Sequence, residues 1–296
     1  MSDGVSPRTV DEHLALLTCD RVVERIVDRT GGSREEIGRI LDMYATEARY
    51  GYNLITPQLS NDHTTILEVG SGLCMLSSYL RMQGYDITAL EPCIAGFDLF
   101  AEIQAVLLEE AGVSLPILRV KAEELSPKRH GLFQFVFSIN VLEHIPNLAN
   151  AIRGMASVLT PDGHMWHTCP NYAVPYEPHF GVPLVPFFPR ATGLLLPRGI
   201  AGGELWRSLN FVTYFGLRRM ARANNLSVSF RRGTMAEALK RLDSDPEFAR
   251  RHSSLLYRAH RLLGAAGLLR VIESIPPMLS TPMMVAMGTA ARVGPY

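Results

Sequence analysis

The stretch from Thr65 to Leu76, TILEVGSGLCML, most constrains what this chain can fold into. A short apolar run that includes Glu68 stops at Gly70-Ser71-Gly72, and a segment that can be helical follows. This pattern predicts a buried parallel strand, a tight glycine turn and the start of a helix. Glycine is needed because a Cβ would prevent the backbone angles of the turn and the close approach of a ligand. The unpaired N–H groups of the helix start then face whatever lies over the turn, which indicates a nucleotide-type binding cradle.

The same stretch excludes two common nucleotide sites. A dinucleotide-binding turn has the pattern Gly-x-Gly-x-x-Gly, which lets its helix lie close beneath a pyrophosphate, but Met75 stands at the third glycine position here. The phosphate-binding P-loop is excluded because no Gly-Lys-Ser/Thr follows the turn.

A second acidic residue lies where an adenosine would need it. Residues Asp86–Leu90 predict the next strand, and Glu91-Pro92 follows about 20 residues beyond the glycine turn. A carboxylate at the carboxyl end of that strand can accept hydrogen bonds from both hydroxyls of an adenosine ribose.

Two later segments complete an ordered set of motifs. Phe133–Ser138 predicts a buried fourth strand and runs into Val141-Leu142-Glu143-His144. The segment Leu159–Gly163 contains a Pro-x-Gly turn signal, and His164–Cys169 predicts a fifth strand after that turn. Together with the glycine turn and Glu91, these segments resemble the class I S-adenosylmethionine-dependent methyltransferases, from Thr65 to Pro170.

Three residues depart from the motifs of that family. The first family motif, acid-x-Gly-x-Gly-x-Gly, is matched by Glu68, Gly70 and Gly72, but Cys74 stands at the third glycine position. Lys121 replaces the acid that is usual after the third strand, and Gln134 replaces the usual acid of the fourth strand.

The resemblance implies a fold and a cofactor. The fold is α/β, a Rossmann-like seven-stranded sheet that is mostly parallel with the last strand antiparallel, with helices on both faces plus helical N-terminal and cap insertions. The implied cofactor is S-adenosyl-L-methionine. The residues that the resemblance assigns to the cofactor are Glu68, Gly70, Ser71, Gly72, Glu91, Pro92, Ala122, Glu123, Asn140 and Val141.

Patterns outside the motifs divide the chain into four parts. Helical spacings predict three helices between Val10 and about Thr56, so we expect residues 1–60 to form a helical cap. Residues 61–170 are the predicted cofactor-binding core, 171–225 a substrate lid, and 226–296 the C-terminal part of the sheet. That last part includes a helical insertion from Met235 to about Glu273.

Polar residues after the fifth strand are candidates for acceptor chemistry. A hydroxyl acceptor must lose a proton, and a neutral imidazole is a suitable base near pH 7. His179 is the first candidate, because Glu177 could orient its ring, and His144 is the second. Tyr172 and Glu177 are predicted to bind the acceptor. The spacing of carboxylates and histidines is unspecific, so we expect no metal.

The segment Phe180–Leu196 is rich in proline and apolar residues. Such a patch would be abnormal if it were exposed on a soluble monomer. It is either a lid folded over the site or a surface for a membrane or another partner. The acceptor is therefore expected to be a small molecule, a glycan or a lipid-linked compound.

The amino-acid composition limits the partners and the cellular location that this protein can have. Lysine plus arginine and aspartate plus glutamate both number 29, which gives no global electrostatic reason to expect a nucleic acid partner. The four cysteines form no CxxC pair, and no signal pattern or membrane span is evident, so we expect a cytoplasmic protein with reduced thiols. A catalytically silent regulatory or scaffolding subunit of the same fold is the alternative function. The oligomeric state stays open.

Overall fold

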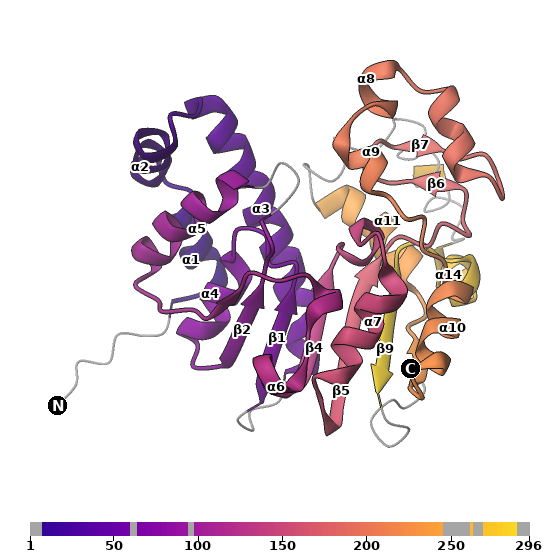
Figure 1. The fold of residues 1–296 in the computed structure, drawn as a ribbon. Helices are drawn as coiled ribbons and strands as arrows, with labels where there is room; N and C mark the ends of the chain where they lie inside the picture. The colour runs from indigo at the N-terminus through magenta and orange to yellow at the C-terminus, as the bar shows by residue number, and fades with distance from the viewer. Residues whose placement is uncertain (1–7, 60–63, 94–97, 245–260, 263–268, 289–296) are drawn as a thin grey trace.

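The structure, a computed structural model, describes residues 8–59, 64–93, 98–244, 261–262 and 269–288. Its centre is a seven-stranded sheet with the order β3-β2-β1-β4-β5-β9-β8 (Figure 1). Neighbouring strands from β3 to β5 run parallel, whereas β9 is antiparallel to both β5 and β8. The strands are β1 (Thr65–Val69), β2 (Asp86–Leu90), β3 (Ile117–Leu118), β4 (Phe133–Ile139), β5 (Leu159–Cys169), β8 (Ser227–Phe230) and β9 (Met283–Gly288). The predicted fold class is confirmed.

Helices cover both faces of this sheet. The α-helices are α1 (Val10–Leu17), α2 (Asp20–Thr30), α3 (Arg34–Ile55), α4 (Met75–Met82), α5 (Asp98–Ala111), α6 (Pro127–His130), α7 (Leu148–Ser157), α8 (Arg198–Ala201), α9 (Glu204–Ser208), α10 (Tyr214–Ala223), α11 (Thr234–Ser244) and α14 (Leu269–Glu273). Short 3-10 turns span Thr56–Gln58, Ala122–Glu124, Leu142–His144, Pro189–Leu194 and Pro277–Leu279. A small hairpin joins β6 (Tyr176–Glu177) and β7 (Val182–Pro183).

Side-chain alternation along the strands creates two cores. In β4, Phe135 and Phe137 belong to one core and Val136 to the other, because successive side chains of a strand point to opposite faces. The first core also holds apolar residues of α1 to α5, and the second holds those of α7 and α10. The sheet is therefore buried on both sides, as its nearly continuous apolar strands require.

The three predicted N-terminal helices are present, and local capping explains where they begin and end. Thr9 and Glu12 form a reciprocal capping box at the start of α1. The Ser33 side chain accepts a hydrogen bond from the Glu36 N–H at the start of α3 (3.4 Å). Gly31, with a φ of 69°, ends α2 in the left-handed conformation that favours glycine.

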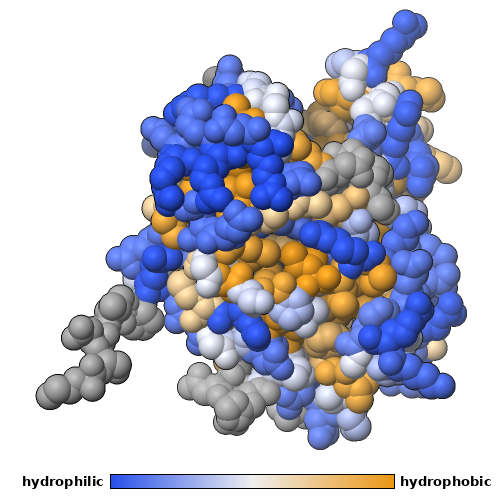
Figure 2. Space-filling view, turned by 60° about the vertical axis from the view of Figure 1, so that its left-hand side comes forward, coloured by the Kyte–Doolittle hydropathy of each residue, from blue (hydrophilic) through white to orange (hydrophobic). Residues whose placement is uncertain are grey.

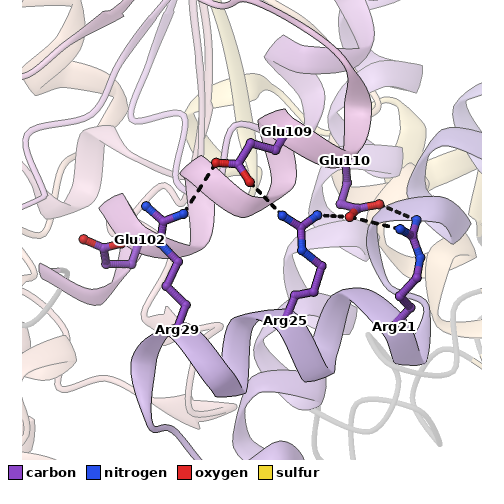
Figure 3. Close-up of polar contacts among 6 residues, drawn as sticks. All are labelled: Arg21, Arg25, Arg29, Glu102, Glu109 and Glu110. Atoms are coloured by element: carbon purple, nitrogen blue, oxygen red, sulfur yellow. Dashed lines mark hydrogen bonds and ion pairs between the residues drawn. The ribbon is translucent and has the colours of Figure 1, made fainter.

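A ladder of ion pairs holds α2 against α5 (Figure 3). Arginines at intervals of four residues on α2 face glutamates of α5, and the six residues are Arg21, Arg25, Arg29, Glu102, Glu109 and Glu110. Arg25 lies 2.7 Å from Glu109, and Arg21 and Arg25 both bind Glu110. Because the side chain of Glu110 is 5% exposed, these two arginines neutralise a nearly buried carboxylate.

The structure corrects one boundary and leaves part of a predicted helix undescribed. The Pro-x-Gly segment before His164 is not a separate turn, because β5 already begins at Leu159 and takes up the extra residues as a shift of its register against β4. The Phe133 N–H donates to the Val158 carbonyl (2.7 Å) and fixes that earlier start.

The helical insertion predicted from Met235 is seen as α11 and α14, and residues 245–260 and 263–268 lie outside the described residues.

Residues between β5 and α10 form a projecting part above the sheet, at the upper right of Figure 1. It contains the β6–β7 hairpin, α8 and α9. Leu184 and Trp206 are buried inside it, and Phe180 packs against that core. None of the helices among the described residues combines the length and the apolar character needed to span a bilayer.

Candidate active site

One cavity of about 1740 Å³ joins the carboxyl ends of β1, β2 and β4 to the projecting part. Gly70, Glu91 and Asn140 line it where these three strands end, which is where open α/β sheets bind ligands. His144 and His179 line the part that faces the hairpin. All ten predicted cofactor residues and both candidate histidines therefore line a single space.

The two glycines of the turn are required by their neighbours. Gly70 and Gly72 have φ values of 71° and 52°, which favour glycine. A Cβ on Gly72 would collide with the ring of Tyr44, and a Cβ on Gly70 would collide with Val141. The turn is thus packed between α3 and the loop after β4 and leaves no room for a side chain.

Cys74 explains why the third glycine of the family motif can be replaced. Its φ is 59°, so it adopts the left-handed conformation at the position before α4. Its sulfur lies 3.3 Å from the Ser71 hydroxyl, and the side chain is buried. The cysteine therefore keeps the backbone path of the motif.

Glu91 links the end of β2 to the glycine turn. Its Oε2 accepts a hydrogen bond from the Gly72 N–H (2.8 Å), and its Oε1 accepts one from the Cys93 N–H (3.3 Å). Burial raises the pKa of Glu91, although these two N–H groups oppose that shift. The carboxylate is held in one orientation at the edge of the cavity.

Glu68 lies beneath the turn. Its side chain is buried and accepts a hydrogen bond from the Ser77 hydroxyl. Burial raises the pKa of Glu68 to about 7, so this carboxyl group titrates near neutrality.

The loop after β3 closes another side of the cavity. Pro92, Ala122 and Glu123, three of the predicted cofactor residues, line it. The Ala122 carbonyl packs so closely against Gly154 of α7 that a Cβ there would overlap it. Lys121, which replaces the usual acid, is exposed, and its N–H donates to the Glu124 carboxylate (2.9 Å).

Asn140 is hydrogen-bonded to Glu47, a residue for which the sequence predicted no role. It has a φ of 53° at the end of β4, and its Nδ2 donates to Oε2 of Glu47 on α3 (3.2 Å). Glu47 and Tyr50 of α3 both line the cavity. The helical pattern of α3 places these residues on one helix, but no sequence signal connects them to β4.

His179 is held by a buried carboxylate. Its Nδ1 lies 2.5 Å from Glu177 Oε1, to which the Tyr172 hydroxyl also donates (3.2 Å). The Phe180 N–H donates to the second oxygen of Glu177 (2.8 Å). Tyr172 and Glu177 do not line the cavity, because the hairpin turns Glu177 inward behind His179. The structure therefore does not bring these two residues to the acceptor side, where we expected them.

Two further titratable groups lie beside His179. The rings of His144 and His179 are 5.1 Å apart, and Glu143 Oε1 lies 3.9 Å from His179 Nε2. The Glu143 side chain is completely buried, and neither of its oxygens has a hydrogen-bond partner among the described residues. In the sequence, Glu143 is part of the motif after the fourth strand and has no predicted role of its own.

The pKa values of His179, His144 and Glu143 are shifted for different reasons and in different directions. Burial would lower the pKa of His179, but the Glu177 carboxylate, together with the charges of Glu143 and Glu47, more than reverses this and raises it above the usual value. Burial, assisted by His179, lowers the pKa of His144 to about 4. Burial raises the pKa of Glu143 to about 7.

The rest of the cavity wall on this side is mainly apolar. It is formed by residues of α3, α9, α11 and α14 and of the turn after α14, namely Met43, Leu205, Met235, Ala238, Leu239, Leu242, Ile272 and Ile275. Arg207 and Arg241 add positive charge at its border.

The cradle fits S-adenosylmethionine. Glycine at two crowded positions keeps the turn free of side chains, and a fixed carboxylate at the end of β2 offers acceptors for ribose hydroxyls. The buried carboxyl of Glu68 and the amide of Asn140 supply polar atoms near the turn.

Comparisons with known proteins agree with this geometry. A family model described as a methyltransferase domain matches residues 19–229. The uncharacterised protein Rv1509 of Mycobacterium tuberculosis is 34% identical over 259 residues, which are 82% of this chain and 85% of that protein. The ubiquinone biosynthesis O-methyltransferase of Marinobacter nauticus is 31% identical over 116 residues, 38% of this chain and 47% of that enzyme.

A solved structure, phosphoethanolamine N-methyltransferase 2 of Haemonchus contortus in complex with S-adenosyl-L-methionine, has a TM-score of 0.48 and 15% identity, over 90% of this chain and 60% of that chain.

The family match covers more than half of the chain and includes the glycine turn, Glu91 and the loop after β4. This chain therefore belongs to the class I S-adenosylmethionine-dependent methyltransferases.

Proposed function

We propose that the protein transfers a methyl group from S-adenosylmethionine to a hydroxyl group of an acceptor that carries a bulky apolar part, such as a lipid-linked molecule. The observation that carries this proposal is the Glu177–His179 pair, which presents the His179 Nε2 to the cavity that also holds the glycine turn.

In this proposal the cofactor residues act mainly by binding and alignment. Gly70, Ser71 and Gly72 admit the methionine end, Glu68 and Asn140 hold its polar groups, and Val141 packs over the turn. Glu91 and Pro92 receive the ribose, and Ala122 with Glu123 receives the adenine. The bound cofactor supplies a methyl group that its sulfonium has already activated, so positioning and exclusion of water are the main requirements.

The acceptor hydroxyl must lose its proton as its oxygen attacks the methyl carbon. The lone pair on His179 Nε2 takes this proton, and Glu177 stabilises the imidazolium that results. His144 is less suited to the task, because burial lowers its pKa to about 4 and makes it a weak base.

Two apolar surfaces support the proposal that the acceptor carries a hydrophobic part. The wall formed by α11 and α14 is apolar inside the cavity. Outside it, Phe187 and Leu194 of the projecting part are 96% and 89% exposed, and Phe188 and Leu195 are exposed beside them. In Figure 2 the upper right of the molecule accordingly shows hydrophobic residues next to hydrophilic ones. The likeness to a ubiquinone biosynthesis O-methyltransferase supports oxygen as the methylated atom.

A paired acceptor screen tests the proposal. Purified protein, S-adenosylmethionine and matched compounds with a hydroxyl or an amine, each with and without a long alkyl or prenyl chain, are assayed for S-adenosylhomocysteine. We expect release with the hydroxyl compounds that carry a chain, and a loss of about 100-fold or more in His179→Asn. Methylation of amines alone would contradict the hydroxyl assignment.

The intact cradle and its continuity with an acceptor cavity favour an enzyme over the alternative of a silent regulatory or scaffolding subunit. That alternative would gain support if the protein bound S-adenosylhomocysteine tightly but methylated no compound of the screen.

A further inference from the structure

The hydrogen bonds around His144 determine which ring nitrogen carries its proton. His144 Nδ1 lies 2.8 Å from the Ser208 hydroxyl oxygen, and the hydrogen of that hydroxyl is donated to the Leu205 carbonyl (2.8 Å). Ser208 must therefore accept from His144, so Nδ1 carries the proton. The Nε2 of His144 is left with a free lone pair.

The same reasoning applies to His179. Its Nδ1 lies against the Glu177 carboxylate, which only accepts hydrogen bonds while it is ionised. Glu177 also accepts hydrogen bonds from the Tyr172 hydroxyl (3.2 Å) and the Phe180 N–H (2.8 Å), so both of its oxygens act as acceptors. Nδ1 of His179 thus carries a proton, and its Nε2 presents a lone pair whenever the ring is neutral, which is the form that binds a metal.

Glu143 completes a set of three electron-pair donors. One donor atom from each of Glu143, His144 and His179 lies within 4.8 Å of the other two. Both oxygens of the fully buried Glu143 carboxylate lack a hydrogen-bond partner among the described residues. Burying a carboxylate opposite two lone pairs is costly unless a positive charge lies between them.

We propose that Glu143, His144 and His179 bind a divalent first-row transition-metal ion through one carboxylate oxygen and the two Nε2 atoms. Two imidazoles and a carboxylate suit zinc, iron, cobalt or nickel better than magnesium or calcium. Bonds to such an ion are about 2.0–2.2 Å long, so the three side chains draw in by about 1 Å when it binds.

Glu177 and Ser208 form the support that such a site needs. Ligating histidines usually donate their other ring N–H to a carboxylate or another acceptor, which fixes the tautomer and the ring orientation. Both imidazoles have that partner here. The sequence did not predict this site, because its ligands come from the loop after β4 and from the β6–β7 hairpin.

The role of the ion, but not its binding, rests on the proposed function. Three protein ligands leave coordination positions open, and an acceptor oxygen can occupy one of them. When the ion is bound, His179 serves as a ligand and is no longer the base, so the ion and the proton compete for the same lone pair.

Cobalt binding tests the site without relying on activity. Tag-free, full-length protein is treated with a chelator, exchanged into chelator-free buffer and titrated with Co²⁺ while its visible absorption is recorded, and zinc is then added as a competitor. We expect one ion per chain, a loss of affinity of about 100-fold or more in Glu143→Gln and His179→Asn, and a loss of about 10–100-fold in Glu177→Gln. His130→Gln, which removes a histidine of α6, is the matched control and should bind cobalt as the wild type does.

Each variant is also titrated with S-adenosylhomocysteine, so that a folded cofactor half is shown independently. The proposal is overturned if the wild type binds no cobalt, or if Glu143→Gln and His179→Asn bind it as tightly as His130→Gln does. If the metal-free wild type methylates hydroxyl compounds and binds no ion, the proposed function stands and the metal site fails. If it binds the ion but methylates no hydroxyl compound, the metal site stands and the acceptor class fails.

Discussion

His179 Nδ1 lies 2.5 Å from Glu177 Oε1, so the ring that faces the cavity is held by a carboxylate that does not line it. In Glu177→Gln the main charge that raises the pKa of His179 is lost, so that pKa should fall, because only the weaker attraction of Glu143 and Glu47 then opposes burial. NMR titration of the metal-free variant measures this shift. Turnover should fall about 100-fold or more, with S-adenosylhomocysteine affinity unchanged.

Tyr172→Phe serves as the matched control for that variant. It removes only the hydroxyl that donates to Glu177 and leaves the bond to His179 in place. We expect less than about a tenfold effect on turnover, the order of one hydrogen bond. An equal loss in both variants would show that general packing, and not the orientation of His179, is responsible.

Glu91→Ala should weaken cofactor binding strongly. The change removes the group placed for the ribose and also releases the Gly72 and Cys93 N–H groups that the carboxylate holds. We expect affinity for S-adenosylhomocysteine to fall about 100-fold, since charged hydrogen bonds are worth about 1.5–3 kcal/mol each. Calorimetric titration measures it, and Asp86→Ala, at the other end of β2, is the control that should bind normally.

The exposed tip of the projecting part should bind anionic bilayers. Its four exposed apolar side chains lie near Arg190 and Arg198, which are also exposed. Phe187→Ser and Leu194→Ser should each lower partitioning onto phosphatidylglycerol vesicles about tenfold, because a buried apolar side chain contributes about 1.5–3 kcal/mol. Leu132→Ser, at another exposed leucine, is the control. If all three variants co-sediment with the vesicles to the same extent, the tip is not a membrane surface, and the interpretation of Phe180–Leu196 as a lid over the site is favoured.

Replacing Arg21 and Arg25 together by methionine should destabilise the protein more than replacing Glu110 by glutamine. The double change leaves the nearly buried Glu110 carboxylate without its two arginine partners, which costs about 1–3 kcal/mol or more. Glu110→Gln instead removes the buried charge itself. Urea unfolding measures the free energy of unfolding of each variant. For Arg29→Met, which breaks only exposed pairs, this free energy should equal that of the wild type within the scatter of the measurement.

His167 should make the protein less stable in acid. It is fully buried beside Ser138, and burial lowers its pKa to about 3. The unfolded chain takes up this proton below about pH 6.5 while the folded chain does not, so stability falls toward pH 3 by about 1.4 kcal/mol per pH unit. The wild type should therefore lose more stability than His167→Gln between pH 7.5 and pH 5.

Comparing these two proteins removes the opposite contribution of Glu68 and Glu143, whose pKa values burial raises to about 7. Parallel pH curves for the wild type and His167→Gln would show that His167 is not the group that titrates.

The core and its cofactor cradle could be predicted because their signals are local. Strand patterns, the glycine turn and Glu91 lie within one short stretch, and each follows from backbone geometry. The histidine side of the cavity could not be predicted from the sequence, because its residues meet only through the fold. Glu47 reaches Asn140 from a distant helix, and Glu143 faces His179 only because a hairpin of two-residue strands, too short for a pattern, folds over it.

The position of β9 has a consequence for how the chain is made. This strand lies between β5 and β8, although it comes after both in the sequence. A ribosome therefore releases the whole cradle and the histidine-bearing hairpin before the strand that joins the two parts of the sheet exists. Until then the outer edge of β5 is open, which exposes a nascent chain to wrong strand pairing. A protein shortened before Met283 would keep every motif residue and still lack a continuous sheet, because β8 would have no strand beside it.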